Sequence, residues 1–244
     1  MRTPWPRLDN AVALLEWRHL RASPARCPLC GPSVVVQLGP SPVGTRCVRC
    51  AASGVTMALV AVLRREVGAL DHLHVYELSS RGPLVNWLRR HAGRVTCSEW
   101  FDGGRPGETV GGVQCQDVQQ LTFATGSFDV CTSTEVFEHV PDDARGFAEL
   151  RRVLRPGGRL VFSVPVWPVA STVERARLSG NGGVEHLLPA EYHGDRIRGR
   201  GRVLAYRNYG SDVLERVAAQ GFRDVRFAVS GLGQWAPPIV VATA

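Results

Sequence analysis

Lysine is absent from the 244-residue sequence, so all 29 basic residues are arginines. This absence excludes several kinds of enzyme. Schiff-base and pyridoxal phosphate chemistry use a lysine amine, as do the Walker A phosphate loop and the ATP site of protein kinases. The hydrophobic content of 44% and the charged content of 21% are ordinary for a folded protein. We therefore expect one α/β domain with a smaller appended module.

Long hydrophobic runs are also absent. No segment has the roughly 18 consecutive apolar residues of a membrane-spanning helix, and the first residues lack the apolar core of a secretory signal. The seven cysteines comprise two close pairs and three single residues, for which we expect small buried side chains in strands: Cys97, Cys115 and Cys131. Unpaired cysteines are typical of a reducing compartment, and the prediction is a cytoplasmic protein.

Charge is unevenly distributed along the chain, whose formal net charge is +7. Residues 1–70 carry nine arginines and three acidic residues, residues 71–150 carry six and twelve, and residues 151–244 carry fourteen and seven. The basic flanks could attract nucleic acid or an anionic substrate, or they could be arginines on a solvated surface. Composition alone leaves both interpretations open.

Two C-x2-C pairs lie in the first fifty residues: Cys27 with Cys30, and Cys47 with Cys50. A two-residue spacer lets both thiolates of a pair bind one ion, and two pairs complete a closed tetrahedral site. The pattern therefore predicts a structural zinc ribbon. A cluster of reduced cysteines without metal is the alternative. A redox function is less well supported, because neither pair begins a helix after a strand of a βαβ unit.

Apolar residues at helical spacing predict a short helix over residues 8–20, before the ribbon, and a connecting helix over residues 52–67, after it. The predicted organisation is a helix and zinc ribbon at residues 1–52, a connector at 53–70 and a main domain at 71–244.

From residue 72 onward, short apolar runs alternate with helical stretches, a pattern typical of a mainly parallel sheet covered by helices on both faces. The predicted strands are residues 74–78, 94–97, 113–116, 128–132, 159–164, 225–229 and 239–242. The predicted helices are residues 84–91, 142–154 and 211–220, the last with Ser211 as its N-cap.

The most specific part of the sequence lies between residues 117 and 158. It includes the runs Leu121-Thr122-Phe123, Ser127-Phe128-Asp129-Val130, Glu135-Val136-Phe137-Glu138-His139-Val140-Pro141-Asp142 and Leu154-Arg155-Pro156-Gly157-Gly158. These runs resemble class I S-adenosylmethionine-dependent methyltransferases, particularly the small-molecule branch that includes enzymes of ubiquinone biosynthesis. The resemblance covers residues 71–165 and implies a seven-stranded, Rossmann-like α/β sheet with helices on both faces.

The resemblance also implies a cofactor site at the carboxyl ends of the strands, where ligands of open α/β sheets bind. Glu77 lies near the amino-acid end of the expected cofactor, and the loop from Ser79 to Gly82 should surround its methionine part. Glu99 corresponds to the acid that accepts the ribose hydroxyls, and Asp117 to the acid that accepts the adenine amino group. The other expected cofactor residues are Val118 and Thr134.

The first loop departs from the family pattern. Where the family has Glu-x-Gly-x-Gly-x-Gly, this sequence has Glu77-Leu78-Ser79-Ser80-Arg81-Gly82-Pro83, with a single glycine out of register. Glycine allows unusual backbone angles and close approach to a ligand, so the sequence predicts a loop of changed shape.

Glu135, Glu138 and His139 form an E-x-x-E-H run, the tightest cluster of groups suited to catalysis. Transfer of a methyl group to a weakly acidic nucleophile needs a base. His139 could act as this base because histidine titrates near neutral pH. A ubiquinone-type O-methyltransferase and small-RNA 2′-O-methyltransferases resemble this run. The resemblance implies that these three residues could bind magnesium, with His186 or His193 as a further ligand. Alternatively, Glu138 and His139 only hydrogen-bond neighbouring loops.

The densest charge run, Arg196–Arg202, lies within residues 166–209, an acceptor-side insertion where the family resemblance is weakest. Family members tend to determine acceptor specificity in this region. The run predicts a loop that contacts phosphates or closes over an anionic acceptor, or else a solvated insertion.

Three hypotheses follow from these patterns. The first is an S-adenosylmethionine-dependent methyltransferase that modifies a small molecule or sugar, at a hydroxyl group, and carries structural zinc. The second is an RNA methyltransferase acting on a 2′-hydroxyl or a base, favoured by the ribbon, the arginine run and E-x-x-E-H. The third is a non-catalytic zinc-ribbon adaptor with a vestigial methyltransferase fold, motivated by the altered first loop. No membrane partner is predicted, and the oligomeric state is left open.

Overall fold

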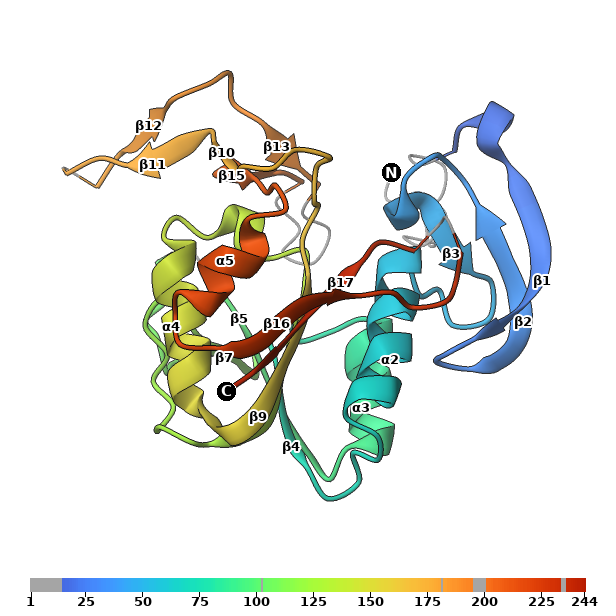
Figure 1. Ribbon diagram of the computed structural model, residues 1–244, viewed down its shortest axis with the longest axis horizontal. Coiled ribbons are helices and arrows are strands. Elements are labelled where there is room, and N and C mark those ends of the chain that lie inside the picture. The colour runs from blue at the N-terminus through green and yellow to red at the C-terminus, as the bar shows by residue number, and fades with distance from the viewer. Residues whose placement is uncertain (1–14, 102, 181, 195–200, 234–235) are drawn as a thin grey trace.

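The computed structural model describes residues 15–244, apart from residues 102, 181, 195–200 and 234–235. Its central sheet has eight strands in the order β16-β17-β9-β8-β4-β5-β7-β6 (Figure 1). The strands of this sheet are β4 His74–Glu77, β5 Arg94–Glu99, β6 Thr109–Val110, β7 Val113–Cys115, β8 Phe128–Thr134, β9 Leu154–Ser163, β16 Arg223–Ala228 and β17 Ile239–Thr243. The seven predicted strands are all present, and β6 is a two-residue addition at one edge.

The middle of the sheet is parallel. β4 pairs with β5 on one side and with β8 on the other, β8 pairs with β9, and β5 pairs with β7. Within this sheet two strands run the other way: β17, which is antiparallel to both β9 and β16, and β6 at the far edge, which is antiparallel to β7. The carboxyl ends of β4, β5, β7 and β8 therefore lie along one edge, as in other Rossmann-like sheets.

Helices cover both faces of the sheet. They are α2 Gly54–Glu66, α3 Pro83–His91, α4 Asp143–Val153 and α5 Val213–Ala218. Leu59 of α2 belongs to the apolar core on one face, together with Val75 of β4. Phe147 of α4 belongs to the core on the other face, together with Tyr76, the next residue of β4. This alternation along a strand is the expected result of burying both faces, and it confirms the predicted fold class.

Two helix starts contrast. α4 begins after Asp142, whose carboxylate accepts a hydrogen bond from Arg145 N at 3.0 Å, as a helix N-cap should. The predicted N-cap of the last helix was wrong, because Ser211 lies two residues before α5 and Asp212 directly precedes it. Asp212 does not cap α5 either. Its carboxylate instead accepts bonds from Thr172 N at 2.8 Å and Thr172 Oγ1 at 2.6 Å.

The segment before the main sheet forms a second, three-stranded antiparallel sheet, called the ribbon below. It consists of β1 Arg21–Cys27, β2 Gly31–Gln37 and β3 Thr45–Cys47, with the short turn η2 Pro42–Gly44 before β3. The first part of the helix predicted at residues 8–20, residues 8–14, lies outside the described residues. The described remainder contains only a 3-10 turn, η1 Trp17–His19.

Residues 166–209, called the arm below, contain three two-stranded antiparallel pairs and are drawn mostly in orange in Figure 1. The pairs are β10 Val173–Glu174 with β15 Arg207–Asn208, β11 Ala176–Leu178 with β12 Val184–His186, and β13 Tyr192–His193 with β14 Val203–Leu204. Of the predicted arginine run, residues 196–200 lie outside the described residues. No helix in the described part of the chain has the length and apolar character needed to cross a membrane.

Candidate functional site

A pocket of about 850 Å³ lies at the carboxyl edge of β4, β5, β7 and β8. This volume is within the range of ~300–1,000 Å³ typical of ligand sites. Five of the seven expected cofactor residues line the pocket: Ser79, Glu99, Asp117, Val118 and Thr134. The other two, Glu77 and Gly82, do not line it; they lie at either end of the first loop, of which Ser79 does line the pocket.

Glu77 is buried at the end of β4. Ser79 Oγ donates to Glu77 Oε1 at 2.7 Å, and Thr132 Oγ1 of β8 donates to the other carboxylate oxygen. Burial raises the pKa of Glu77 to about 7, although these two hydroxyl groups lower it in part. The side chain therefore ties the first loop to β8.

The first loop is also fixed from the other side, by Glu99 of β5. Ser80 donates to Glu99 Oε1 from its backbone N at 2.9 Å and from its Oγ at 3.0 Å. Gly82 has a φ of +110° and directly precedes α3, so the only glycine of the loop is required where the helix begins. The changed loop is thus held by serine–glutamate hydrogen bonds, and one oxygen of the expected ribose ligand Glu99 takes part in them.

Asp117 lies just after β7, in the pocket wall. Its carboxylate accepts hydrogen bonds from the backbone N of Gln119 at 2.9 Å and from Gln119 Nε2 at 3.0 Å. The side-chain oxygen of Gln119 in turn accepts a bond from Asp142 N, at the start of α4, at 3.0 Å. The orientation of Asp117 is therefore fixed through the helix on the neighbouring face.

Glu135 follows β8 with a φ of +53°, a left-handed conformation that is unusual outside glycine. Its N–H donates to the carbonyl oxygen of Ser163 at 3.0 Å. Burial and repulsion by Glu138 raise the pKa of Glu135 to about 8, and the nearby Ser163 hydroxyl and His193 oppose this rise. Backbone strain of this kind costs roughly 1–3 kcal/mol and is concentrated at functional sites.

The next residues form the 3-10 turn η3 Phe137–His139. Glu138 is fully buried, and neither of its carboxylate oxygens has a hydrogen-bond partner in the described structure. His139 Nε2 and His193 Nδ1 each lie 3.7 Å from the same oxygen of Glu138. Ligand atoms of Glu138, His139 and His193 all lie within 4.8 Å of one another, a group that could hold a metal ion. The structure thus brings Glu138 and His139 together with the arm residue His193, and Glu135 is not in this group.

Both imidazole rings are oriented by hydrogen bonds on their far sides. His139 Nδ1 donates to the carbonyl oxygen of Leu204 at 2.8 Å. His193 Nε2 lies 3.2 Å from Glu191 Oε1, and Glu191 also pairs with Arg175 at 3.1 Å. The carboxylates of Glu138 and Glu191 raise the pKa of His193, although burial opposes them. Metal-binding histidines are usually anchored in this way, by a carbonyl or carboxylate on the nitrogen that does not bind the ion.

Arg207 of the arm holds the turn that carries Glu138 and His139. Its buried guanidinium donates to three carbonyl oxygens at 3.1, 2.5 and 2.6 Å, those of Phe137, Val140 and Pro141. The backbone N of Tyr206 donates to the carbonyl oxygen of Glu138 at 2.7 Å. Sequence reasoning missed Arg207. The signal that could have found it is a lone arginine inside the run Ala205-Tyr206-Arg207-Asn208-Tyr209, whose other large side chains are aromatic.

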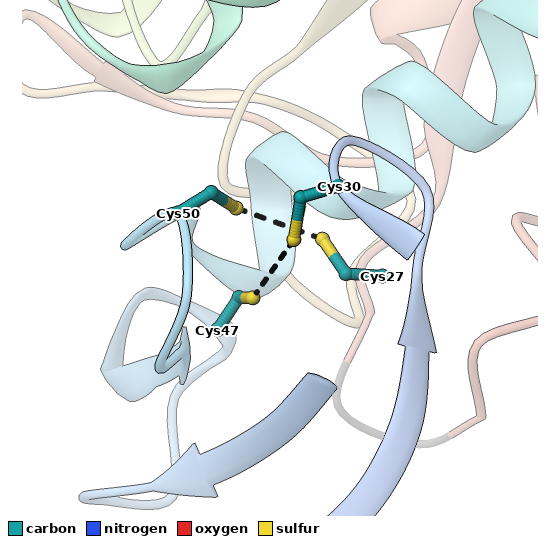
Figure 2. A group of neighbouring side chains, drawn as sticks. All are labelled: Cys27, Cys30, Cys47 and Cys50. Carbon is teal, nitrogen blue, oxygen red and sulfur yellow. Dashed lines mark hydrogen bonds between the residues drawn. The ribbon is translucent and has the colours of Figure 1, made fainter. Parts of the chain in front are cut away.

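The four cysteines of the ribbon converge on one point (Figure 2). The Sγ atoms of Cys27 and Cys50 lie 3.7 Å apart, and those of Cys30 and Cys47 lie 3.6 Å apart. All four are free thiols. A tetrahedron with zinc–sulfur bonds of about 2.3 Å has sulfur–sulfur edges of about 3.8 Å, so the four thiols match the dimensions of a Zn(Cys)4 site.

Cys47 has the surroundings of a metal-binding thiolate. Burial alone would raise the pKa of Cys47, but hydrogen bonds from the Ser33 hydroxyl and from the backbone N–H groups of Cys50 and Arg49 lower it to about 6. The Ser33 Oγ lies 3.2 Å from the sulfur. A thiolate is the form of cysteine that binds zinc, so Cys47 suits the ion, whereas burial raises the pKa of Cys30 and Cys50, which would lose their protons on binding it.

Residues 79–162 match the family model described as Methyltransferase domain. Over 104 residues, 42% of this chain, the sequence is 38% identical to an uncharacterized methyltransferase of Mycobacterium marinum, and the match covers 38% of that protein. Over 55 residues, 22% of this chain, it is 47% identical to an uncharacterized 37.1 kDa protein in transposon Tn4556 of Streptomyces fradiae, of which 16% is covered. The chain thus spans less than two fifths of the length of either relative.

Two solved structures are also similar to this chain. An S-adenosylmethionine-dependent methyltransferase from Mesorhizobium loti is 19% identical, with a TM-score of 0.48, over 77% of this chain and 98% of that one. The 1,6-didemethyltoxoflavin-N1-methyltransferase of Burkholderia thailandensis is 18% identical, with a TM-score of 0.45, over 76% of each chain. The family match over residues 79–162 supports a methyltransferase.

Proposed function

We propose that the protein is a cytoplasmic S-adenosylmethionine-dependent methyltransferase that modifies a hydroxyl group of a small molecule or sugar. The observation that carries this proposal is the composition of one pocket. Glu99, the last residue of β5, and Asp117, just after the neighbouring β7, line the same cavity as the strained Glu135 and His139. Carboxylates at the ends of adjacent parallel strands suit a nucleoside, and the histidine supplies a base beside it.

The chain's own residues have separate roles in this proposal. Asp117, already oriented by Gln119, accepts a hydrogen bond from the adenine amino group. The ionised carboxylate of Glu99 can accept further bonds from ribose hydroxyls in addition to those from Ser80. The bound cofactor supplies an electrophilic methyl group. Thr134 and Glu135 lie at the end of β8, on the acceptor side of the same pocket.

His139 is the proposed base. Its Nδ1 donates to the carbonyl oxygen of Leu204, so in the neutral ring the Nε2 carries the lone pair. Glu138 is the charge partner of this nitrogen, at 3.7 Å, and would stabilise the imidazolium that forms when the ring accepts a proton from the acceptor hydroxyl. Glu135, with a pKa of about 8, is mainly protonated at neutral pH and can donate a hydrogen bond to the acceptor.

A divalent metal ion at Glu138, His139 and His193 is a second proposal for the same site. The two orphaned, buried oxygens of Glu138 and the two anchored imidazoles support it. Such an ion would polarise the acceptor hydroxyl. Imidazole ligands suit ions such as Zn²⁺ or Fe²⁺, whereas Mg²⁺ prefers oxygen ligands, so this set favours a transition metal over the magnesium implied by the resemblance.

The cysteine site completes the proposal. The matching sulfur–sulfur distances support a zinc ion bound by Cys27, Cys30, Cys47 and Cys50. Four thiolates leave no open coordination position, so this ion would stabilise the ribbon and take no part in the chemistry.

Calorimetry with S-adenosylhomocysteine tests the cofactor proposal on the full chain. We expect saturable binding by the wild type and at least about tenfold weaker binding by Asp117→Ala, because a buried polar contact would be lost. Asp71→Ala is the matched control, since Asp71 is an exposed carboxylate that pairs only with His72 among the described residues. Absence of binding by the wild type at millimolar ligand would refute the proposed function.

Elemental analysis tests the metal proposal. After loading with excess Zn²⁺ and desalting, we expect the wild type to retain one more ion per chain than Glu138→Gln. His72→Ala should match the wild type, because His72 is an exposed histidine far from this group in the sequence. Equal zinc contents in all three proteins would leave His139 as a base without a metal.

A further inference from the structure

Three exposed aliphatic side chains line the pocket from outside the main sheet. Leu178 and Val184 belong to the arm, and Val43 belongs to the turn η2 of the ribbon. Their exposed fractions are 50%, 43% and 39%. A single exposed aliphatic residue is common on a protein surface, whereas exposed apolar side chains grouped around a cavity mark a place where a ligand binds. The pocket therefore has an apolar part that the described structure leaves largely open to solvent.

The arm strands β11 and β12 form a hairpin with two unlike faces. Leu178 is paired with Val184 in the antiparallel register, and Arg177 is paired with Glu185. Because successive side chains of a strand point to opposite faces, the two aliphatic residues share one face and the two charged residues share the other. Arg177 Nε donates to Glu185 Oε2 at 2.9 Å, and both side chains are exposed. The face of the hairpin that lines the pocket is therefore its apolar face.

This apolar face is joined to the turn that carries the proposed base. The backbone N of Ala176, in β11, donates to the carbonyl oxygen of Tyr206 at 3.1 Å. The backbone N of Tyr206 donates to the carbonyl oxygen of Glu138 at 2.7 Å. His139 is the next residue, and it lines the pocket together with Leu204, whose carbonyl oxygen accepts the bond from His139 Nδ1. The pocket wall thus continues from the base to the apolar face of the hairpin.

Val43 brings an aliphatic side chain from the other module that borders the pocket. Its backbone N donates to Ser41 Oγ at 3.2 Å, and the turn η2 contacts α2, so the ribbon holds this residue against the main domain. The ribbon and the arm lie on opposite sides of the view in Figure 1. A ligand that fills the pocket therefore contacts aliphatic side chains of both modules.

We propose that the methyl acceptor carries a hydrocarbon group that packs against Leu178 and Val184 of the arm and Val43 of the ribbon, while its hydroxyl group reaches His139. The inference rests on the proposed function, because it needs a methyl acceptor in the pocket. It also decides between the two acceptors of that proposal. A bare sugar has hydroxyl groups around its ring and would leave these aliphatic side chains in contact with polar groups. A small molecule with a hydrocarbon group removes them from water, which favours binding.

The test measures how the affinity for a simple alcohol depends on its chain length. Calorimetry on the full chain, saturated with S-adenosylhomocysteine, compares 1-octanol with 1-butanol, which share the hydroxyl group and differ by four methylene groups. Complete burial of one methylene group strengthens binding about fourfold. Because the pocket is open to solvent on one side, burial of the chain is partial. We therefore expect the wild type to bind 1-octanol at least about tenfold more tightly than 1-butanol.

Three variants place a polar group on the apolar wall with little change in size: Leu178→Asn, Val184→Thr and Val43→Thr. Each should reduce the preference for 1-octanol by about threefold and leave the affinity for S-adenosylhomocysteine unchanged. Val173→Thr in the arm and Val34→Thr in the ribbon are the matched controls. These two valines are 41% and 40% exposed, and neither lines the pocket, so both controls should keep the wild-type preference.

The inference is overturned if the wild type binds S-adenosylhomocysteine but binds the two alcohols equally or binds neither. It is also overturned if the three pocket variants keep the full preference, or if the controls lose as much of it as they do. If only Val43→Thr keeps the preference, the part of the inference that concerns the ribbon is wrong. A wild type that does not bind S-adenosylhomocysteine refutes the proposed function itself, so the two failures are distinguished.

Discussion

On the sheet side of the pocket, β4, β8 and β9 are buried on both faces, and successive residues such as Val75 and Tyr76 belong to two different apolar cores. On the arm side, the strands are two or three residues long, and most of the described side chains from Trp167 to Gly194 are exposed or half-buried. The arm is attached mainly through polar groups, of which the buried Arg207 is the centre.

The attachment of the arm continues into a charged network. Arg207 Nε lies 3.1 Å from Glu174, and Arg216 of α5 pairs with both Glu174 and Asp143, at 2.9 and 2.8 Å. Tyr209 OH donates to Asp143 at 2.9 Å. Apolar packing therefore builds the sheet side of the site, which is the part that resembles other proteins. Directional hydrogen bonds then position the segment that gives this site its own acceptor side.

The largest effect should come from the apolar side. Phe147 is fully buried and stacks on Phe137, with ring centroids 4.1 Å apart. Phe147→Ala should lower the free energy of unfolding by about 3–5 kcal/mol, because it removes a large buried side chain and leaves a cavity. Urea denaturation followed by circular dichroism measures this loss. A loss below about 1 kcal/mol would mean that the core on this face is loosely packed.

Arg207→Met tests the polar side. It leaves the carbonyl oxygens of the turn and part of the charged network without a partner, so we expect a loss of about 3 kcal/mol in the free energy of unfolding. Limited proteolysis should show earlier cleavage within the arm than in the wild type. Arg177→Met is the control in the same arm, because Arg177 forms a fully exposed ion pair with Glu185 and its loss should leave the free energy of unfolding close to that of the wild type. Equal behaviour of the two variants would contradict the central position given to Arg207.

The sheet side was largely predictable from sequence. Each predicted strand is a short apolar run, and such runs carry their own periodicity, so neighbouring residues suffice to identify them. Glu99, Asp117 and Thr134 come next to strand ends, so parallel topology alone brings them to one edge. The same local reasoning predicted that Cys97, Cys115 and Cys131 are buried side chains in strands; all three lie in strands, but only Cys115 and Cys131 are buried, and Cys97 is half-buried.

The other side was not predictable, because its contacts join residues far apart in the chain. His193 meets Glu138 across 55 positions, and Arg207 meets the turn across about 70. No local pattern distinguishes His193 from His186, which lies in β12 and is exposed. Ser211 failed as a helix cap because the arm binds Asp212 through Thr172, a contact that a local rule for helix starts does not include.

The free energy of unfolding should depend on pH through Glu77, the buried acid of the sheet side. The pKa of Glu77 is raised from 4.5 to about 7 by burial, so between pH 4.5 and 7 the unfolded chain loses this proton first. The stabilisation from the protonated form is complete below pH 4.5 and is lost as the pH rises toward 7. Stability should therefore fall by about 2–3 kcal/mol across this window.

Glu77→Gln should make the dependence of stability on pH less steep, because an amide has no proton to lose. Urea denaturation of both proteins at pH 5 and pH 8 measures the difference. Glu135 has a raised pKa of the same sign, so part of the slope should persist in the variant. Parallel curves for the two proteins would show that Glu77 titrates normally, and would contradict the burial of its carboxylate.

The smallest expected effect comes from removing either of two helix caps. Ser53 caps α2 next to the ribbon, and Asp142 caps α4 on the other face of the sheet. Ser53 Oγ accepts a bond from Thr56 N at 3.1 Å, and Asp142 caps α4 in the same way. Ser53→Ala and Asp142→Ala should each cost about 1 kcal/mol. Cys47 of the ribbon shares its apolar core with α2, so the ribbon should unfold together with the sheet, and both variants should shift one common transition by similar amounts. Fluorescence and circular dichroism should then give coincident curves. If Ser53→Ala produced a separate early transition, the ribbon would be an independent unit, and its side chains would not be fixed in the wall of the pocket.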